Sequence, residues 1–479
     1  MERNLTFHTF FYLISLVMMR VCGILAKILL ARPLTPYEYG LITLIVLTIP
    51  NIMQLITNFC FYDILGHGTD GKKYLGISLV YGILATVILG IIFFIFQETI
   101  FTFLNIPQAY WEMCCIVIFI VLFSVTIRGV LTGYLRGIRA HTYAASLSAE
   151  PSILRVIFLA CAIYLFGIDD FYAIIILFAL PPLITLIPVI IYKFRELSLS
   201  LKTILIPNRK MVMFGLSFFI LSLWMGLTQM ISSIVISHDL GIIWQGYYDV
   251  SLSTVAVITF FSSAIYLVSG PETTTTNNRS DLLKNKGGFG DIGKFLFSMC
   301  LLCVLILYFY SYQIITLLFT EKYAISSDYI IILAIGYAIL FIQQYCAYLT
   351  ISVEEEKGLS RLSIITIASL VLFPFFSHFM ILNFNFMGAY LATTFFIIFY
   401  TIITIVLIRD RTPLALLFVK IDRLALSVLG TFLIIYILHF SLIPGILTSL
   451  VSFTSLIFLL GYVKKDIITD MVRLKSKKS

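Results

Sequence analysis

The sequence predicts an all-α membrane protein that crosses the bilayer about fourteen times, and three observations support this fold class. First, 60% of the 479 residues are hydrophobic and only 12% are charged. A soluble globular protein is about 45–50% apolar and about 25% charged, so this composition is typical of a bilayer protein. Second, apolar runs of about 20 residues, the length that crosses the hydrocarbon core, recur along the chain. Third, Lys and Arg are concentrated in alternate connections between those runs.

Each apolar run is interpreted as one transmembrane helix. The first run has about 25 residues, which is longer than the core of a signal peptide, and no small-x-small cleavage pattern follows it. We therefore interpret it as a span. The fourteen expected spans are residues 6–30, 40–65, 75–97, 111–132, 144–166, 171–193, 211–236, 246–268, 292–312, 325–350, 361–382, 387–408, 423–441 and 445–463.

The distribution of basic residues predicts the orientation of the chain. With the N-terminus in the cytoplasm, all but five of the 32 Lys and Arg residues fall in cytoplasmic connections or at their flanks. Cytoplasmic loops of membrane proteins carry such an excess of basic residues. We therefore predict a multi-pass protein of the cytoplasmic membrane with both termini cytoplasmic. This placement also accounts for the net charge of +8, which we do not attribute to nucleic-acid binding.

The sequence carries no pattern that indicates a cofactor, a metal site or a catalytic centre. The eight cysteines lie inside apolar runs, and the six histidines lack the spacing of metal ligands. Residues 288–293 match the GxGxxG pattern of dinucleotide-binding loops, but they lie in a connection between two spans rather than between a strand and a helix. We interpret that connection as a linker, and we predict no enzyme activity, no cofactor and no metal.

Two stretches that lie 206 residues apart indicate an internal repeat. ARPLTPYEYGLITL at 31–44 aligns with SHDLGIIWQGYYDV at 237–250, and Gly40 falls on Gly246. In both stretches a long span is followed by a turn of about ten residues, and the next span begins at the glycine. We interpret ARPLTPYEYG as an extracytoplasmic hinge, in which prolines stiffen the turn and the glycine permits tight re-entry.

The repeat predicts the domain organisation. An even number of spans separates the two copies, so the halves have the same orientation. Parallel repeats of this kind place a transport site at their interface, near the midplane of the membrane. We expect two pseudo-symmetric six-helix lobes at residues 1–195 and 196–422, followed by two extra helices and a basic cytoplasmic tail at 423–479.

Four motifs follow one another along the chain: ILLARPLTPYEYGLITL, LTGYLRGIRAHTYAA, WQGYYDVSLS and LLFTEKY. In this order they resemble the polysaccharide-type flippases of the multidrug/oligosaccharidyl-lipid/polysaccharide exporter superfamily. The resemblance covers spans one to twelve, and the two extra spans fit the fourteen-span branch. It implies two six-helix lobes arranged as a V, alternating access, and a substrate made of a sugar chain on a polyisoprenyl phosphate or pyrophosphate.

Three cations inside the expected spans are candidates for binding that substrate. Arg20 and Lys27 are seven residues apart on one face of the first span, about 20 and 30 Å from its cytoplasmic start. Arg155 lies in the fifth span, and Glu150 is five positions away, which is off the ideal pairing distance. A charge at the centre of a span costs about 2.5–3.5 kcal/mol, so such a residue is a functional candidate by default. We expect all three to bind an anionic headgroup, and bonding to carbonyls between packed helices is the structural alternative.

Polar stripes on two spans are candidates for binding sugar. Amide and hydroxyl groups suit sugar hydroxyls, so we expect these stripes to line a wetted cavity; interhelical hydrogen bonding is the alternative. Asp63, near the inner end of the second span, is a candidate ion or proton site. Arg128, near the cytoplasmic end of its span, is expected to reach the lipid headgroups. The stripes are Asn51, Gln54 and Asn58 in the second span and Ser222, Gln229, Ser232 and Ser233 in the seventh.

These features predict a flippase that moves a polyisoprenyl-(pyro)phosphate-linked oligosaccharide from the cytoplasmic to the outer leaflet by alternating access of two lobes around a basic central cavity. Its expected partners are this glycan, membrane lipids, and glycosyltransferases or a polymerase of the same pathway; we expect a monomer. A multidrug or cation antiporter of the same superfamily is the first alternative, but those proteins have an acidic residue in the first span, where this chain is basic. A membrane-embedded glycan polymerase or acyltransferase is the second alternative, and the chain lacks the large loop or the His/Asp constellation that it needs.

Overall fold

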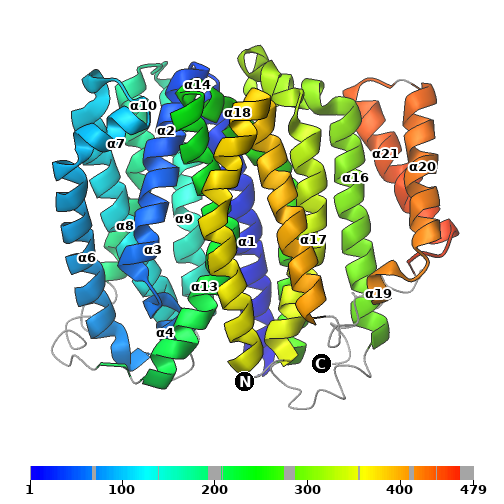
Figure 1. The fold of residues 1–479 in the computed structure, drawn as a ribbon, viewed down its shortest axis with the longest axis horizontal. Helices are drawn as coiled ribbons and strands as arrows, with labels where there is room; N and C mark the ends of the chain where they lie inside the picture. Colours follow the sequence, from blue (N-terminus) through cyan, green and yellow to red (C-terminus); the bar gives the residue numbers. More distant parts are fainter. Residues whose placement is uncertain are drawn as a thin grey trace. The chain divides into compact units, whose positions relative to one another are not determined.

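The computed structural model describes residues 2–66, 72–138, 140–191, 206–207, 209–273, 286–353, 356–408, 415–438 and 440–463 (Figure 1). Every regular element among these residues is a helix, which confirms the predicted all-α class. The helices are α1 (Glu2–Ala31), α2 (Pro36–Ile42), α3 (Ile49–Asn58), α4 (Phe61–Gly66), α6 (Leu75–Ile95), α7 (Gln97–Phe103), α8 (Trp111–Gly137), α9 (His141–Ala160), α10 (Phe171–Ala179), α11 (Pro181–Ile184), α13 (Arg209–Asp239), α14 (Ile242–Thr273), α16 (Lys286–Phe319), α17 (Ile330–Val353), α18 (Glu356–Ile408), α19 (Ala415–Phe418), α20 (Ile421–Leu438) and α21 (Leu442–Leu459).

The long helices confirm that the chain is an integral membrane protein. Among the described residues, nine segments are long and apolar enough to cross a membrane, and a bent pair with 58° between its two parts makes a tenth. One of the nine, Ser363–Val406, covers two expected spans and is broken at Asn385, where φ is +52°. Three further expected spans lie on α1, α13 and α14, which have 30, 31 and 32 residues. The total of fourteen spans stays a prediction.

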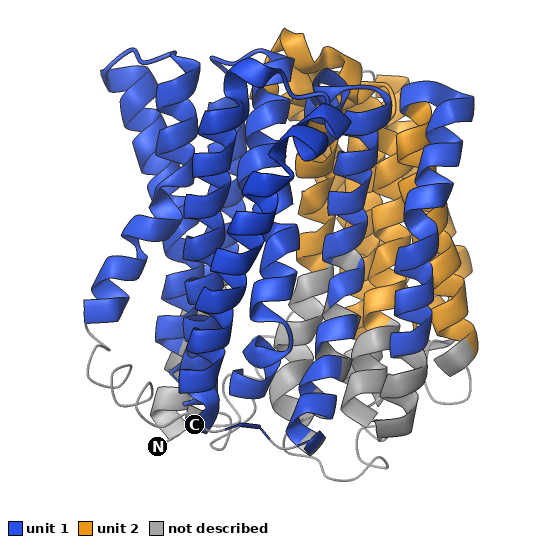
Figure 2. Cartoon of the chain, turned by 60° about the vertical axis from the view of Figure 1, so that its left-hand side comes forward, with its two compact units in different colours: residues 1–249, 363–386 blue, residues 250–362, 387–479 orange. Residues whose placement is uncertain are grey.

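The chain divides into two compact units, which Figure 2 distinguishes by colour. Unit one comprises Met1–Asp249 and Ser363–Phe386, and unit two comprises Val250–Leu362 and Met387–Ser479. These units are bounded differently from the lobes expected at 1–195 and 196–422. The lobes follow the repeat in the sequence, so they stay a prediction about duplication rather than a description of the compact units.

In unit one, α8 is the central helix and contacts α3, α4, α6 and α9, while α1 packs along α9. Small and hydroxyl-bearing residues fill the contacts of α8. Thr126 Oγ1 on α8 lies 2.6 Å from Thr57 Oγ1 on α3 and accepts a hydrogen bond of 3.2 Å from Thr86 on α6. A Cβ at Gly82 would lie 3.0 Å from Thr126 Cγ2, so the small residue allows close approach. Helices in a bilayer associate through such close packing and hydrogen bonds.

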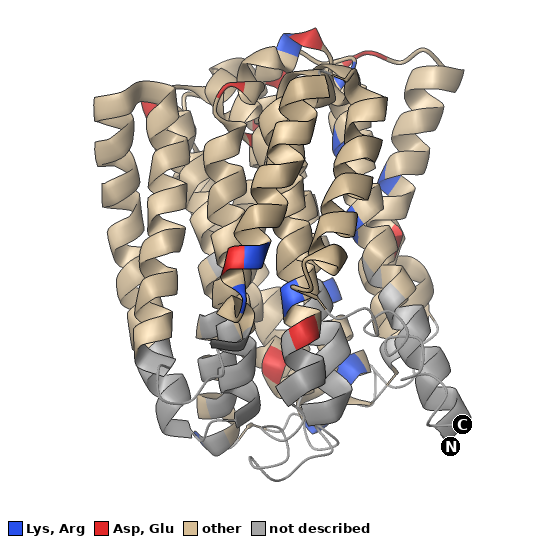
Figure 3. Ribbon diagram, turned by 90° about the vertical axis from the view of Figure 1, so that its right-hand side faces the viewer, with Lys and Arg blue, Asp and Glu red and all other residues tan. Residues whose placement is uncertain are grey.

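In unit two, α16 contacts α17, α19, α20 and α21. Ser251 anchors the start of this unit, because its hydroxyl donates to the carbonyl of Ser326 at 3.0 Å and lies 2.9 Å from Tyr390 OH. The described helices of both units carry few charged residues over most of their length (Figure 3). Each charge that does lie within a span therefore needs a local explanation.

Candidate functional site

The turn after α1 is built by a local sequence signal. Thr35 adopts extended backbone angles and its hydroxyl accepts a hydrogen bond from the amide of Glu38. The Glu38 carboxylate in return accepts from the amide of Thr35 at 2.8 Å. This reciprocal capping box, with Pro36 at the first helical position, starts α2. The prolines of ARPLTPYEYG thus start a helix as well as restrict the turn.

The repeat-related turn after α13 uses different chemistry. Here Gly241 has a φ of +98°, and α14 begins at the next residue, Ile242. Trp244, on the first turn of α14, packs on Phe386 with ring centroids 4.6 Å apart. A left-handed glycine therefore replaces the capping box, and an aromatic contact fixes the start of the helix.

The two re-entry glycines pack against each other. A Cβ on Gly40 would collide with the carbonyl oxygen of Ile242 and would lie 2.9 Å from the amide nitrogen of Gly246. A Cβ on Gly246 would collide with the carbonyl oxygen of Pro36 and would lie 3.3 Å from the amide nitrogen of Gly40. Residues 36 and 242 also differ by 206, so each turn makes the same contact with the other. Reciprocal contacts of this kind are the mark of a two-fold relation, and they support the internal repeat.

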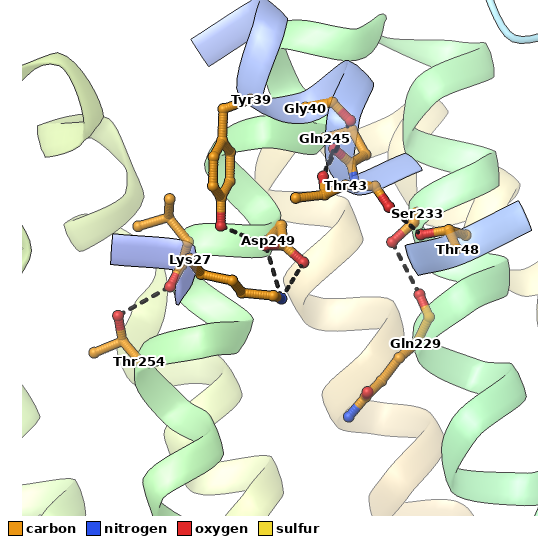
Figure 4. A network of polar contacts seen from close by, with 11 residues as sticks. Lys27, Tyr39, Gly40, Thr43, Thr48, Gln229, Ser233, Gln245, Asp249 and Thr254 are labelled. Carbon is orange, nitrogen blue, oxygen red and sulfur yellow. Dashed lines mark hydrogen bonds and ion pairs between the residues drawn. The ribbon is translucent and has the colours of Figure 1, made fainter. Parts of the chain in front are cut away.

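A second reciprocal pair lies beside the glycines (Figure 4). Tyr39 donates from its hydroxyl to Asp249 Oδ2 at 2.7 Å, and Thr43 Oγ1 lies 3.2 Å from Gln245 Oε1. The offset of 206 relates Tyr39 to Gln245 and Thr43 to Asp249, so the two hydrogen bonds are repeat-related. One is neutral and the other includes a carboxylate.

Lys27 adds an ion pair to this cluster. Its Nζ lies 2.9 Å from both carboxylate oxygens of Asp249. The side chain of Lys27 is 21% exposed and that of Asp249 is 10% exposed. Figure 4 shows Lys27 from α1, Tyr39 from α2 and Asp249 from α14 pointing toward one another. We refer to Lys27, Tyr39, Thr43, Gln245 and Asp249 as the turn cluster.

A π-helical segment follows the turn cluster. Residues Thr43–Thr48 form it, and the amide of Ile49 donates to the carbonyl of Leu44, five residues earlier. Single π-helical turns inside α-helices are frequent at functional sites. In this chain the π-helical segment joins α2 to α3 within the second span.

The seventh-span candidates lie near the turn cluster in Figure 4. The hydroxyl of Ser233 donates to the carbonyl of Gln229 at 3.1 Å, within α13, and the Gln229 side chain points away from Ser233. Ser233 is the repeat equivalent of Lys27, because the two numbers differ by 206. The side chain of Ser222 lies outside the described residues.

The second-span candidates are used mainly in packing. The amide nitrogen of Gln54 donates to the carbonyl of Val125 on α8 at 3.1 Å. Asn58 is 7% exposed and lies against Gly129, where a Cβ would collide with its amide group. Asn51 is half-buried. Gln54 and Asn58 therefore make contacts between helices, as the alternative interpretation of this polar stripe expects. Their role in a cavity stays a prediction.

The other candidate cations differ from Lys27. Arg20 lies on α1 with an exposed side chain. Arg155 on α9 is half-buried; its Nε donates to the carbonyl of Phe178 on α10 at 2.9 Å, and its guanidinium lies 4.5 Å from the centroid of the Phe178 ring.

Arg128 on α8 makes contacts within the protein, although its place in the sequence predicts that it reaches the lipid headgroups. Its guanidinium donates to Thr185 Oγ1 at 2.5 Å and to the carbonyl of Pro182. The chain supplies these acceptors where α11 packs on α8, so one end of the guanidinium is hydrogen-bonded within the helix bundle.

Asp63 lies beyond the second span. That span ends at Asn58, and Phe59, with a φ of +37°, separates it from the short helix α4 that carries Asp63. Burial raises the pKa of the Asp63 carboxyl to about 6, although the Coulombic attraction of Arg136 acts in the opposite direction. A carboxyl with this pKa can exchange a proton near neutral pH, and the ion or proton role of Asp63 stays a prediction. No described group of His, Cys, Asp and Glu residues could hold a metal ion.

Asp249, the partner of Lys27, is not among the residues that the sequence predicts for the site. Asp249 is the single charged residue in the expected span 246–268. Lys27 is one of two charged residues in the expected span 6–30, which precedes the turn ARPLTPYEYG. An intramembrane charge usually pairs with another. That rule, applied across the repeat, makes Asp249 one candidate partner, and the structure shows that it is the partner of Lys27. Tyr39 gives no such signal, because its role depends on the rotation of α2.

The sequence matches the polysaccharide biosynthesis protein family over residues 29–328, which is more than half of the chain. No curated protein matches it in the comparison with curated proteins. The fold is similar to that of the lipid II flippase MurJ in an inward closed conformation, with a TM-score of 0.68, 15% identity, and coverage of 93% of this chain and 97% of that chain. It is also similar to the MATE multidrug transporter DinF-BH, with a TM-score of 0.61, 14% identity, and coverage of 87% of this chain and 97% of that chain.

A third solved structure, an inward-facing multidrug resistance MATE family transporter of the MOP superfamily, has a TM-score of 0.58 at 14% identity and covers 86% of this chain and 99% of that chain. At these identities the likeness establishes the fold. The family match shows that the chain belongs to the polysaccharide biosynthesis protein family, and its fold is similar to the folds of these three solved structures.

Proposed function

Because the chain belongs to the polysaccharide biosynthesis protein family and has a transporter fold, we propose that it is a flippase for an anionic, lipid-linked oligosaccharide. The cargo is a sugar chain on a polyisoprenyl phosphate or pyrophosphate, and it moves from the cytoplasmic to the outer leaflet by alternating access. The protein lies in the cytoplasmic membrane with both termini in the cytoplasm, and it can act beside glycosyltransferases or a polymerase of its pathway.

The observation that carries this proposal is a partly exposed cation, Lys27, near the C-terminal end of α1. Lys27 keeps a fifth of its side chain exposed while its ammonium is held by Asp249. Arg20, two helical turns earlier on the same helix, also has an exposed side chain. A basic, accessible first span favours a negatively charged cargo, because a cation facing lipid would cost about 2.5–3.5 kcal/mol. The structure of a lipid II flippase with the same fold supports a cargo of this class.

We assign the candidate residues different roles in transport. Lys27 and Arg20 bind the phosphate of the cargo, and Gln229 and Ser233 on α13, together with Asn51, offer amide and hydroxyl groups to its sugars. Arg155, Gln54 and Asn58 hold helices together through the contacts described above. Asp63 exchanges a proton or ion on the side opposite the turn cluster.

The test is a complementation experiment in cells that lack the protein. We expect a lipid-linked oligosaccharide to accumulate in the cytoplasmic leaflet, and the intact chain to clear it. Lys27→Met should fail to clear it at equal membrane abundance. Lys322→Met removes the same charge from an exposed position and serves as the matched control. A normal lipid profile combined with a new sensitivity to cationic drugs would refute the flippase and favour the antiporter.

A further inference from the structure

Asp249 holds Lys27 in a geometry that two oxygens of a phosphate could reproduce. Lys27 Nζ lies 2.9 Å from both carboxylate oxygens, and Oδ2 also accepts from Tyr39 OH at 2.7 Å. The side chain of Lys27 is 21% exposed, so this ion pair is not sealed inside the protein. The carboxylate is therefore a chemical stand-in for an anionic ligand.

The repeat shows that this ion pair is an addition to the architecture. The reciprocal glycine contact and the neutral Thr43–Gln245 pair join the two turns without any charge. At the repeat-related positions, Ser233 stands in place of Lys27 and Thr43 in place of Asp249. A pair needed only to join the turns would not have to be ionic. The charges are therefore available for another task.

That task is to control the charge of the site. A partly buried ammonium needs an anion nearby, because burial without one is costly. If the cargo phosphate binds Lys27, the Asp249 carboxylate must give up at least one of its two contacts, since two anions cannot share one ammonium at close range without repulsion. Cargo and carboxylate therefore exclude each other at this position.

We propose that Asp249 is an internal counter-anion, which occupies Lys27 when the site is empty and is displaced by the phosphate of the cargo. Tyr39 keeps the displaced carboxylate close enough to return. The exchange weakens binding of the cargo and makes its release faster, because Asp249 competes for Lys27 on the product side as well. This inference rests on the proposed function and specifies how its site discriminates an anion and then releases it.

The first test measures the affinity of the purified full-length chain for inorganic pyrophosphate by calorimetry. Asp249→Asn keeps the shape of the side chain and removes its charge, and we expect it to bind pyrophosphate about tenfold more tightly than the unmodified chain. Tyr39→Phe removes one hydrogen bond from the carboxylate, and we expect a gain of about threefold. Glu112→Gln, which neutralises an exposed carboxylate in the same unit, is the matched control and should change nothing.

A double-mutant cycle separates competition from a general change in charge. Lys27→Met should abolish pyrophosphate binding, and the combination of Lys27→Met with Asp249→Asn should not restore it. If Asp249→Asn gave no gain, or if it gave the same gain in the absence of Lys27, the counter-anion role would be refuted. If Asp249→Asn fails to fold, Tyr39→Phe replaces it: absence of the threefold gain in pyrophosphate affinity, or the same gain without Lys27, would refute the counter-anion role.

The second test measures turnover in vesicles that contain a fluorescent polyprenyl-pyrophosphate oligosaccharide. Asp249→Asn should lower the KM for the cargo and also lower kcat, because release becomes slow. A purely structural role would lower kcat through loss of folded protein without lowering KM. If the unmodified chain moves the cargo but Asp249→Asn binds no tighter, the flippase stands and the counter-anion fails. If the unmodified chain does not move the cargo, the proposed function itself fails.

Discussion

Lys27 and Arg155 are both half-buried cations on helices of unit one, and the protein stabilises them by different contacts. Lys27 faces a carboxylate, Asp249, from a helix that belongs to the repeat-related half of the sequence. Arg155 faces a backbone carbonyl and the ring of Phe178 on α10. The carbonyl and the ring carry no net charge, and both belong to Phe178 on α10. They therefore hold Arg155 as part of the packing between α9 and α10. A carboxylate can be exchanged for another anion, so the comparison separates a binding cation from a packing cation.

The largest effect should come from breaking the contact that places Asp249. Gly40→Ala puts a Cβ against the backbone of Ile242 and Gly246, which cannot move aside as a flexible side chain can. We expect a loss of about 3 kcal/mol in the free energy of unfolding, at the upper end for overpacking. Gly23→Ala on α1, where a Cβ would meet nothing within 4 Å, is the control and should be neutral or slightly stabilising. Thermal unfolding in detergent measures both, and equal stability of the two variants would contradict the close contact.

Arg155→Met tests whether Arg155 acts in packing rather than in binding. It removes a hydrogen bond and a cation–π contact, so we expect about 2 kcal/mol less stability. Transport per inserted molecule should persist, in contrast to Lys27→Met. The measurement is clearance of the lipid-linked oligosaccharide, normalised to the amount of protein in the membrane. Complete loss of clearance at normal abundance would show that Arg155 contacts the cargo after all.

Asp63 offers a third arrangement, an acid whose burial outweighs the attraction of a nearby Arg136. Its pKa is about 6 in the folded chain and near 3.8 in the unfolded chain, so the folded state binds the proton more tightly. Stability should therefore be greatest at low pH and should fall by about 2 kcal/mol as the pH rises from about 4 to about 6. Unfolding experiments across this range check the slope. Asp63→Asn should remove that contribution, and an unchanged slope in this variant would assign it to other groups.

The smallest effect concerns the helix start that orients Tyr39 toward Asp249. Thr35→Ala removes the hydroxyl of the capping box and should lower stability by about 1 kcal/mol. Ser441→Ala is a matched control, because Ser441 precedes α21 but makes no capping hydrogen bond. Thermal unfolding should show a larger loss of stability for Thr35→Ala than for Ser441→Ala. Equal losses would mean that the capping box adds nothing to the turn.

Several features of the site could be predicted from the sequence because they depend on local pattern. The spacing of the glycines in the two turns predicts that they are equivalent, and the structure shows them in contact. Lys27 is a candidate from the sequence because a charge within an apolar run needs a partner or a function. The polar stripe of the second span was also found, yet Gln54 and Asn58 contact α8, because helical periodicity says which residues share a face and not what that face meets.

The sequence by itself determined the fold class, the family and the presence of cations in apolar runs, and it predicted the repeat, because hydropathy, charge placement and motif order are properties of short segments. Only the tertiary structure decided which partner each cation has. The pairing of Lys27 with Asp249 spans 222 residues, and it depends on the close approach of two glycine turns and on the rotation of three helices. Such rotations are set by packing between distant segments, so no local pattern encodes them.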